Sequence, residues 1–145
     1  MDILHILLSA FIATSAMTWF SYLLATIQSN EFKEPRLINI LIDRSGKLSR
    51  TITKNSLIGW AIHYFLGLIF IIAFDIMWVY TTVEATFLSG ALFGLIAGII
   101  GVVGWKTMFR LSPNPPDIEY NKFYLHLIAA HLILGLTAAL IHSHF

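Results

Sequence analysis

The residues of this chain with most capacity for chemistry are a few polar side chains set inside long apolar segments. His63 and His131 each begin the pattern His-x-x-Leu-Gly-Leu, and Asp75 and His126 also lie within apolar segments. Ionisable groups are costly in lipid, so each of these residues is a candidate for an intramembrane polar site. If the shared pattern marks a repeat, His63 and His131 lie at similar depth and both face the interior of a bundle.

Three interpretations of this histidine pair stay open. Imidazoles on facing helices, with small residues between them, are typical of b-type haem, for which His63 and His131 would be the axial ligands. A metal site is less well supported because no carboxylate ligand accompanies the two histidines. In the third interpretation both are neutral side chains that hydrogen-bond to carbonyl or hydroxyl groups and fix the helix register. Haem b is therefore the cofactor alternative, and no metal site is predicted.

Asp75 raises a different alternative, a small proton-linked transporter. Such a relay needs a second ionisable group at matching depth, and Glu84 lies nearer the surface. The chain has no nucleophile elbow, phosphate loop or His-Glu-x-x-His motif, so no catalytic residue is predicted and enzyme activity is disfavoured. Cysteine is absent, which excludes disulfides and iron–sulfur clusters.

The elements that must position these side chains are long apolar helices. The chain has 145 residues, of which 57% are hydrophobic. A span needs about 20 apolar residues, and its backbone must be helical because lipid offers no hydrogen-bond partners. The sequence predicts an all-α, polytopic bundle of four transmembrane helices in one domain, 1–145, and two repeated helix hairpins if the shared pattern is a duplication and not chance. The predicted transmembrane helices are 3–27, 56–80, 85–109 and 123–141. The short 81–84 turn makes the second and third spans antiparallel neighbours, and Asp117 is predicted to cap the fourth.

Positive charge is confined to two parts of the chain. All 9 Lys and Arg residues lie within 33–54 and 106–122. Positively charged loops stay on the cytoplasmic side, so both termini are predicted on the other side. Within the cytoplasmic loop 28–55, residues 34–43 are predicted to form an interfacial helix whose apolar side enters the headgroup boundary. The basic residues predicted to contact anionic lipid or a partner are Arg36, Arg44, Lys47, Arg50 and Lys54.

The third span carries small residues at three- and four-residue steps. Such a stripe brings a neighbouring helix close, so helix packing is the main interpretation. The glycines of this seam are Gly90, Gly94, Gly98, Gly101 and Gly104. The alternatives are a surface that makes room for a planar ligand, or contact with a second copy in a homodimer or larger membrane complex. Membrane lipid is the other predicted partner, and nucleic acid is not one.

Short motifs in all four spans carry a resemblance to a known group. The motifs are Ala13-Thr14-Ser15-Ala16-Met17-Thr18, Gly59-Trp60-Ala61-Ile62-His63-Tyr64-x-x-Gly67, Pro113-Asn114-Pro115 and His131-x-x-x-Gly135. Together they resemble small, uncharacterised four-helix proteins of the bacterial inner membrane. The resemblance implies a helical inner-membrane protein and supplies no catalytic residue.

The sequence thus favours a small integral membrane protein that acts as a lipid- or partner-binding accessory module. Its working face is predicted to be the basic, cytoplasmic one. The alternatives are a haem-binding redox subunit that uses His63 and His131, and a proton-linked transporter that uses Asp75.

Overall fold

The predicted all-helical bundle is confirmed by a computed structural model, which describes residues 2–28, 32–46 and 51–144. The helices of these residues are α1 (Ile3–Gln28), α2 (Glu34–Arg44), α3 (Leu57–Tyr80), α4 (Phe87–Leu111) and α5 (Tyr120–His142). Within the described ranges there is no strand. All but α2 are long and apolar enough to cross a membrane. Their ends differ from the predicted spans by only a few residues.

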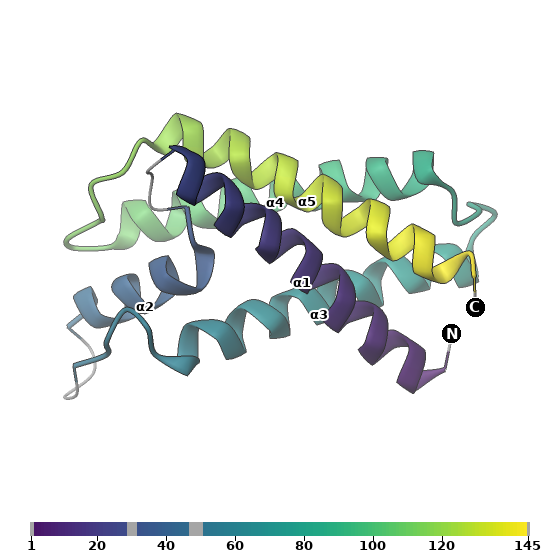
Figure 1. The fold of residues 1–145 in the computed structure, drawn as a ribbon, viewed down its shortest axis with the longest axis horizontal. Coiled ribbons are helices and arrows are strands. Elements are labelled where there is room, and N and C mark those ends of the chain that lie inside the picture. Colours follow the sequence, from purple (N-terminus) through teal and green to yellow (C-terminus); the bar gives the residue numbers. More distant parts are fainter. Residues whose placement is uncertain (1, 29–31, 47–50, 145) are drawn as a thin grey trace.

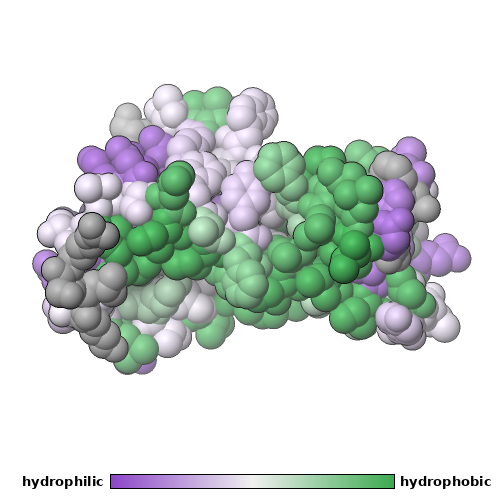
Figure 2. All heavy atoms as spheres, turned by 90° about the horizontal axis from the view of Figure 1, so that it is seen from below, coloured by the Kyte–Doolittle hydropathy of each residue, from purple (hydrophilic) through white to green (hydrophobic). Residues whose placement is uncertain are grey.

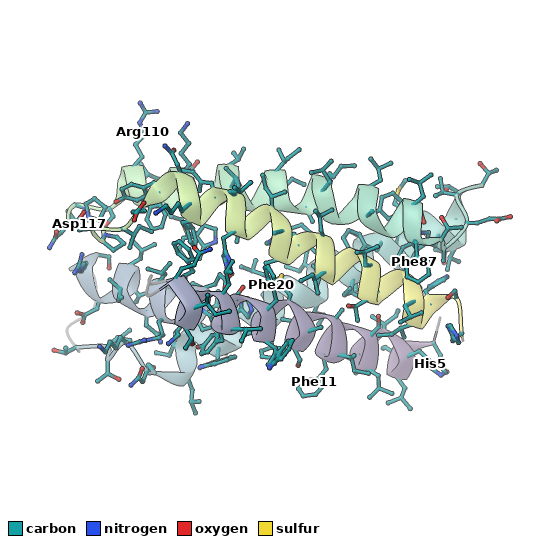
Figure 3. All side chains as sticks on the ribbon, turned by 45° about the horizontal axis from the view of Figure 1, so that its top comes forward. His5, Phe11, Phe20, Phe87, Arg110 and Asp117 are labelled. Carbon is teal, nitrogen blue, oxygen red and sulfur yellow. The ribbon has the colours of Figure 1, made fainter. Side chains whose placement is uncertain are left out.

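The bundle has two distinct ends. Both termini lie at the end that also holds the α3–α4 turn, whereas α2 and the α4–α5 loop lie at the opposite end (Figure 1). Arg110 and Asp117 lie at the α2 end and His5 lies near the other (Figure 3). Between the ends, the face seen in Figure 2 carries a broad hydrophobic band. We call the two ends the α2 end and the turn end.

The long helices do not pack as a symmetrical set. α4 packs along α5, and α1 packs on both α5 and α3. By contrast, α3 and α4 meet near the turn end, where the indole Nε1 of Trp78 donates to the Ser89 hydroxyl at 3.1 Å and the rings of Phe74 and Phe93 lie 5.6 Å apart. The prediction that α3 and α4 are packed neighbours therefore holds only at that end. A pseudo-two-fold repeat would also make the α3–α4 contact match the α1–α5 contact, which the packing does not do.

The short helix α2 packs against the bundle at the α2 end. Pro35 stands in its first turn, where the missing amide hydrogen costs nothing. Leu37 is completely buried and Ile38 is 7% exposed, in a cluster with Trp105 and Phe123. The helix was correctly predicted, but its apolar side turns to the protein and not to the headgroup boundary. The reason is that α3 and α4 separate at this end and leave apolar surface that α2 covers.

Local capping sets where the long helices begin. The Ser56 hydroxyl accepts from the amide of Ile58 at the start of α3, and Thr86 and Ser89 form a capping box at the start of α4. The predicted cap at Asp117 is wrong. The N-cap of α5 is Glu119, whose side chain makes no capping hydrogen bond. Proline-rich backbone before that point disfavours helical geometry, so the helix begins later than Asp117.

Candidate functional site: a cavity with buried carboxylate and histidine groups

A cavity of about 360 Å³ lies between the separated parts of α3 and α4. Most of its lining is apolar, and α2 closes it at the α2 end through residues such as Ile38 and Leu41. Leu66, Ile100 and Met108 line it and are 46%, 55% and 41% exposed. The cavity therefore opens on the outer, apolar surface of the bundle, between α3 and α4.

Polar side chains from three helices also line the cavity. They are Glu34 of α2, His63 of α3 and His131 of α5. All of them are buried, with 2%, 6% and 6% of their surface exposed. The structure thus brings the two predicted histidines to one cavity and adds a carboxylate that the sequence analysis did not select.

Glu34 is held in place by side chains of α1 and α5. The Ser21 hydroxyl donates to Glu34 Oε1 at 2.8 Å, and His126 Nε2 lies 3.0 Å from that hydroxyl and 3.5 Å from the carboxylate. Because Ser21 gives its hydrogen to the carboxylate, His126 must donate Nε2–H to the Ser21 oxygen. Glu34 Oε2 and His126 Nδ1 are buried without a hydrogen-bond partner among the described residues.

The ionisation of Glu34 follows from its surroundings. Burial raises the pKa of this carboxyl, while the hydrogen bond with His126 and the positive charges that His63 and His126 carry when protonated lower it. The lowering effects are larger together, so the pKa of Glu34 lies below its ordinary value. The lowered pKa favours the carboxylate form of Glu34, and part of this lowering depends on positive charge on the neighbouring histidines.

The tautomer of His63 is fixed by two threonines of α1. The Thr18 hydroxyl donates to the Thr14 carbonyl at 2.6 Å, and the same oxygen lies 2.8 Å from His63 Nε2. Since the hydroxyl hydrogen is already used, His63 donates its Nε2–H to Thr18. In the neutral imidazole, Nδ1 of His63 then carries the lone pair.

His131 has the opposite tautomer. Its Nδ1 lies 2.8 Å from the Leu127 carbonyl oxygen, which can only accept, so Nδ1 carries the hydrogen and Nε2 the lone pair. This nitrogen points to the surface of α4, because a Cβ placed on Gly101 would lie 3.4 Å from it. Gly101 lines the cavity, so a larger residue there would cover the Nε2 lone pair.

The glycine seam of α4 has two parts. Gly90, Gly94 and Gly98 face α5, and a Cβ on Gly94 would lie 2.5 Å from the His131 carbonyl oxygen. At Gly104 a Cβ would meet nothing within 4 Å, and this residue lines the cavity with Gly101. The first part is used within the bundle, so the packing gives no support for a homodimer through it. The second part leaves space for a ligand.

Asp75 belongs to a separate polar pair near the turn end. Its Oδ1 lies 3.3 Å from His142 Nδ1, so α5 supplies the ionisable partner that the transporter alternative requires. The completely buried Leu134 and the 1% exposed Ile71 lie between this pair and the cavity histidines along α5 and α3. The described structure shows no polar connection between the two sites.

The basic residues predicted to contact lipid are dispersed. Nη1 of Arg44 donates to the Asn114 carbonyl at 3.3 Å and so joins α2 to the α4–α5 loop. Arg36 is half-buried and Lys54 is exposed. Lys47 and Arg50 lie outside the described residues. Lipid contact by this set stays a prediction.

The arrangement of the histidines does not favour haem ligation. His63 uses its Nε2–H for the hydrogen bond to Thr18, so this nitrogen has no lone pair to offer iron in the present geometry. Metal ions held by several side chains are a different case, and among the described residues no group of three or more His, Cys, Asp or Glu side chains could hold one. His63 and His131 each bond to a hydroxyl or carbonyl group, as the third interpretation expects, and their neutral state stays a prediction.

Two further buried polar residues, Glu34 and Asn39, escaped the sequence analysis. Glu34 shares the spacing i, i+3, i+4, i+7 with Leu37, Ile38 and Leu41, which places it on the apolar side of α2. This spacing is the sequence feature from which the burial of Glu34 could have been predicted. Asn39 is completely buried and has no such signal, because its partners lie on α3 and the segment before it.

No family model, curated protein or solved structure matches the chain. The resemblance to small four-helix inner-membrane proteins stays a prediction. The geometry of the cavity is therefore the basis for assigning a function.

Proposed function

We propose that this protein binds a small amphipathic molecule in the cavity between α3 and α4. Small-molecule pockets of about 300–1,000 Å³ combine an apolar lining with a few polar groups that orient the ligand. A cavity of about 360 Å³ with Glu34, His63 and His131 in an otherwise mainly apolar lining has this composition. This observation carries the proposal, and it moves the predicted lipid-binding role from the basic surface to the bundle interior.

The surroundings of the cavity indicate how the ligand reaches it. Its opening faces the apolar surface of the bundle, so a molecule dissolved in the bilayer can enter without crossing water. We place the protein in a bacterial inner membrane, as the resemblance suggests, with the α2 end in the cytoplasm. All Lys and Arg residues of the chain lie within 33–54 and 106–122, and the described parts of these segments lie toward that end. The polar groups of the cavity then lie in the cytoplasmic half of the bilayer.

Gly104→Leu tests the proposal by narrowing the cavity at its edge. Gly104 lines the cavity, is exposed and has no neighbour within 4 Å of an added Cβ, so the new side chain occupies open space there. The protein in lipid nanodiscs is irradiated with a dodecanol that carries a diazirine in its chain. We expect labels on Leu66, Ile100 and Met108 in the original chain, and a loss of at least about fivefold in the variant.

The matched control is Val103→Leu. Val103 is the preceding residue of α4, is 59% exposed and does not line the cavity, so its labelling pattern should equal that of the original chain. Thermal unfolding of both variants checks that they remain folded. Equal labelling of the three cavity residues in folded Gly104→Leu protein would overturn the proposal.

A further inference from the structure

The hydrogen bonds around the cavity determine which kind of polar group its ligand carries. The neutral His131 offers a lone pair on Nε2 because its Nδ1–H is used by the Leu127 carbonyl. The neutral His63 offers a lone pair on Nδ1 because its Nε2–H is used by Thr18. A neutral imidazole of either tautomer can accept one hydrogen bond at its unprotonated nitrogen.

The carboxylate adds a third acceptor and a charge. Glu34 Oε1 already accepts from Ser21, while Oε2 is buried without a partner among the described residues. An unpaired carboxylate oxygen away from water is costly, so this group favours a partner that brings hydrogen and positive charge. The Nε2 of the neighbouring His126 lies 3.5 Å from Oε1, and Oε2 receives no hydrogen bond from it.

Aromatic rings complete the lining. Phe70 and Trp105 both border the cavity, from α3 and α4. The face of an aromatic ring attracts a cation, most strongly when the cation is desolvated. The indole N–H of Trp105 is a neutral donor and leaves the charge of the cavity unchanged. Ring faces, a carboxylate and imidazole lone pairs are all complementary to a protonated amine.

We propose that the ligand is a primary ammonium amphiphile, whose charged head meets Glu34, His63 and His131 while its apolar body lies toward the opening between α3 and α4. This inference rests on the proposed function and specifies its ligand class. A primary ammonium has three N–H donors for the acceptors of the cavity. An alcohol brings a single donor and no charge, and a carboxylate ligand would bring a second negative charge next to Glu34.

Competition against the photolabel distinguishes between these polar head groups of the ligand. Unlabelled dodecylamine, dodecanol, dodecyltrimethylammonium and dodecanoate are each added to nanodiscs that contain the protein and the dodecanol diazirine. We expect dodecylamine to suppress the labels on Leu66, Ile100 and Met108 at a concentration at least about tenfold lower than dodecanol does. The trimethylammonium compound, which has charge but no N–H, should be weaker than the amine, and dodecanoate should be the weakest.

Glu34→Gln tests the role of the charge. The amide oxygen can still accept from Ser21, so the local hydrogen bond is kept while the negative charge is lost. The variant should lose the preference for amine over alcohol and still bind the alcohol label. The control is Asp75→Asn, which removes a buried carboxylate near the turn end, outside the cavity, and should keep the preference.

The outcomes separate this inference from the proposed function. Cavity labelling with no preference for the amine, or a preference that persists in Glu34→Gln, would overturn the ammonium ligand and leave the cavity as a binding site. Absence of cavity labelling by the dodecanol diazirine in the original chain would overturn the proposed function itself. If Glu34→Gln does not fold, the order of the four competitors on the original chain still decides the ligand class.

Discussion

Each cavity histidine has one hydrogen bond that decides which of its nitrogens carries the proton. For His63 the deciding group is the Thr18 hydroxyl. It donates its hydrogen bond to the Thr14 carbonyl, so toward His63 it can only accept. For His131 it is the Leu127 carbonyl, one helical turn away. These bonds hold the rings in place and leave the lone pair on the other nitrogen of each neutral ring.

Thr18→Val tests this relation at the residue scale. Valine has nearly the shape of threonine but cannot accept the Nε2–H of His63, which is 6% exposed. A buried donor left without a partner costs about 1–3 kcal/mol, so we expect a loss of this size in the free energy of unfolding. Reversible unfolding in mixed detergent micelles measures it.

Thr26→Val is the control for that substitution. The Thr26 hydroxyl also donates to a carbonyl one turn earlier on α1, at 2.9 Å from the Tyr22 oxygen, but it is exposed. Its replacement should change the free energy of unfolding by less than about 0.5 kcal/mol, as is usual for surface positions. Equal losses for the two variants would show that the bond from His63 to Thr18 contributes nothing.

At the scale of elements, Asn39 ties α2 to the start of α3. Its Oδ1 accepts from the Gly59 amide at 2.8 Å, and its Nδ2 donates to the Ser56 carbonyl at 2.7 Å and the Lys54 carbonyl at 3.2 Å. The side chain thus satisfies an amide of the first turn of α3 that has no partner within that helix. Gly59 allows the approach, because a Cβ there would collide with the Pro35 carbonyl oxygen.

Asn39→Ala should therefore release α2 from the bundle. All three hydrogen bonds are lost at a completely buried position, which leaves polar backbone groups without partners. We expect the amides of α2 to exchange with solvent deuterium at least about tenfold faster in nanodiscs, while the amides of α5 keep their protection. Asn121→Ala, an exposed asparagine at the start of α5, is the control and should leave α2 unchanged. Unchanged exchange in α2 after Asn39→Ala would refute this role.

The elements could be predicted from the sequence more fully than their packing. The length of the apolar segments predicts the four long helices, and Pro35 followed by an apolar stripe predicts α2. The separation of α3 and α4 could not be predicted, because it depends on where α2 packs. The same holds for Glu34, whose spacing puts it on the apolar side of α2. Its partners Ser21 and His126 lie on other helices, and only the assembled fold brings them together.

At the scale of the whole molecule, the described parts of the basic segments and the buried carboxylate of the cavity lie at the same end of the bundle. The α2 end contains the basic segments, the helix that closes the cavity and the buried carboxylate, whereas the turn end contains the Asp75–His142 pair. Moving Lys and Arg across a membrane is costly, so the topology that we propose keeps the basic end in the cytoplasm. The orientation of the bundle therefore also sets the half of the bilayer from which a ligand reaches the polar groups of the cavity.

Single cysteines can test this orientation directly, because the chain has no cysteine of its own. Thr82 in the α3–α4 turn and Asn114 in the α4–α5 loop are both exposed, at opposite ends of the bundle. In spheroplasts, a membrane-impermeant maleimide should label Thr82→Cys and leave Asn114→Cys unlabelled until the membrane is opened. Inverted vesicles should give the reverse. Labelling of Asn114→Cys in sealed spheroplasts would place the basic end outside, and the ammonium head of the ligand would then face the non-cytoplasmic half of the bilayer.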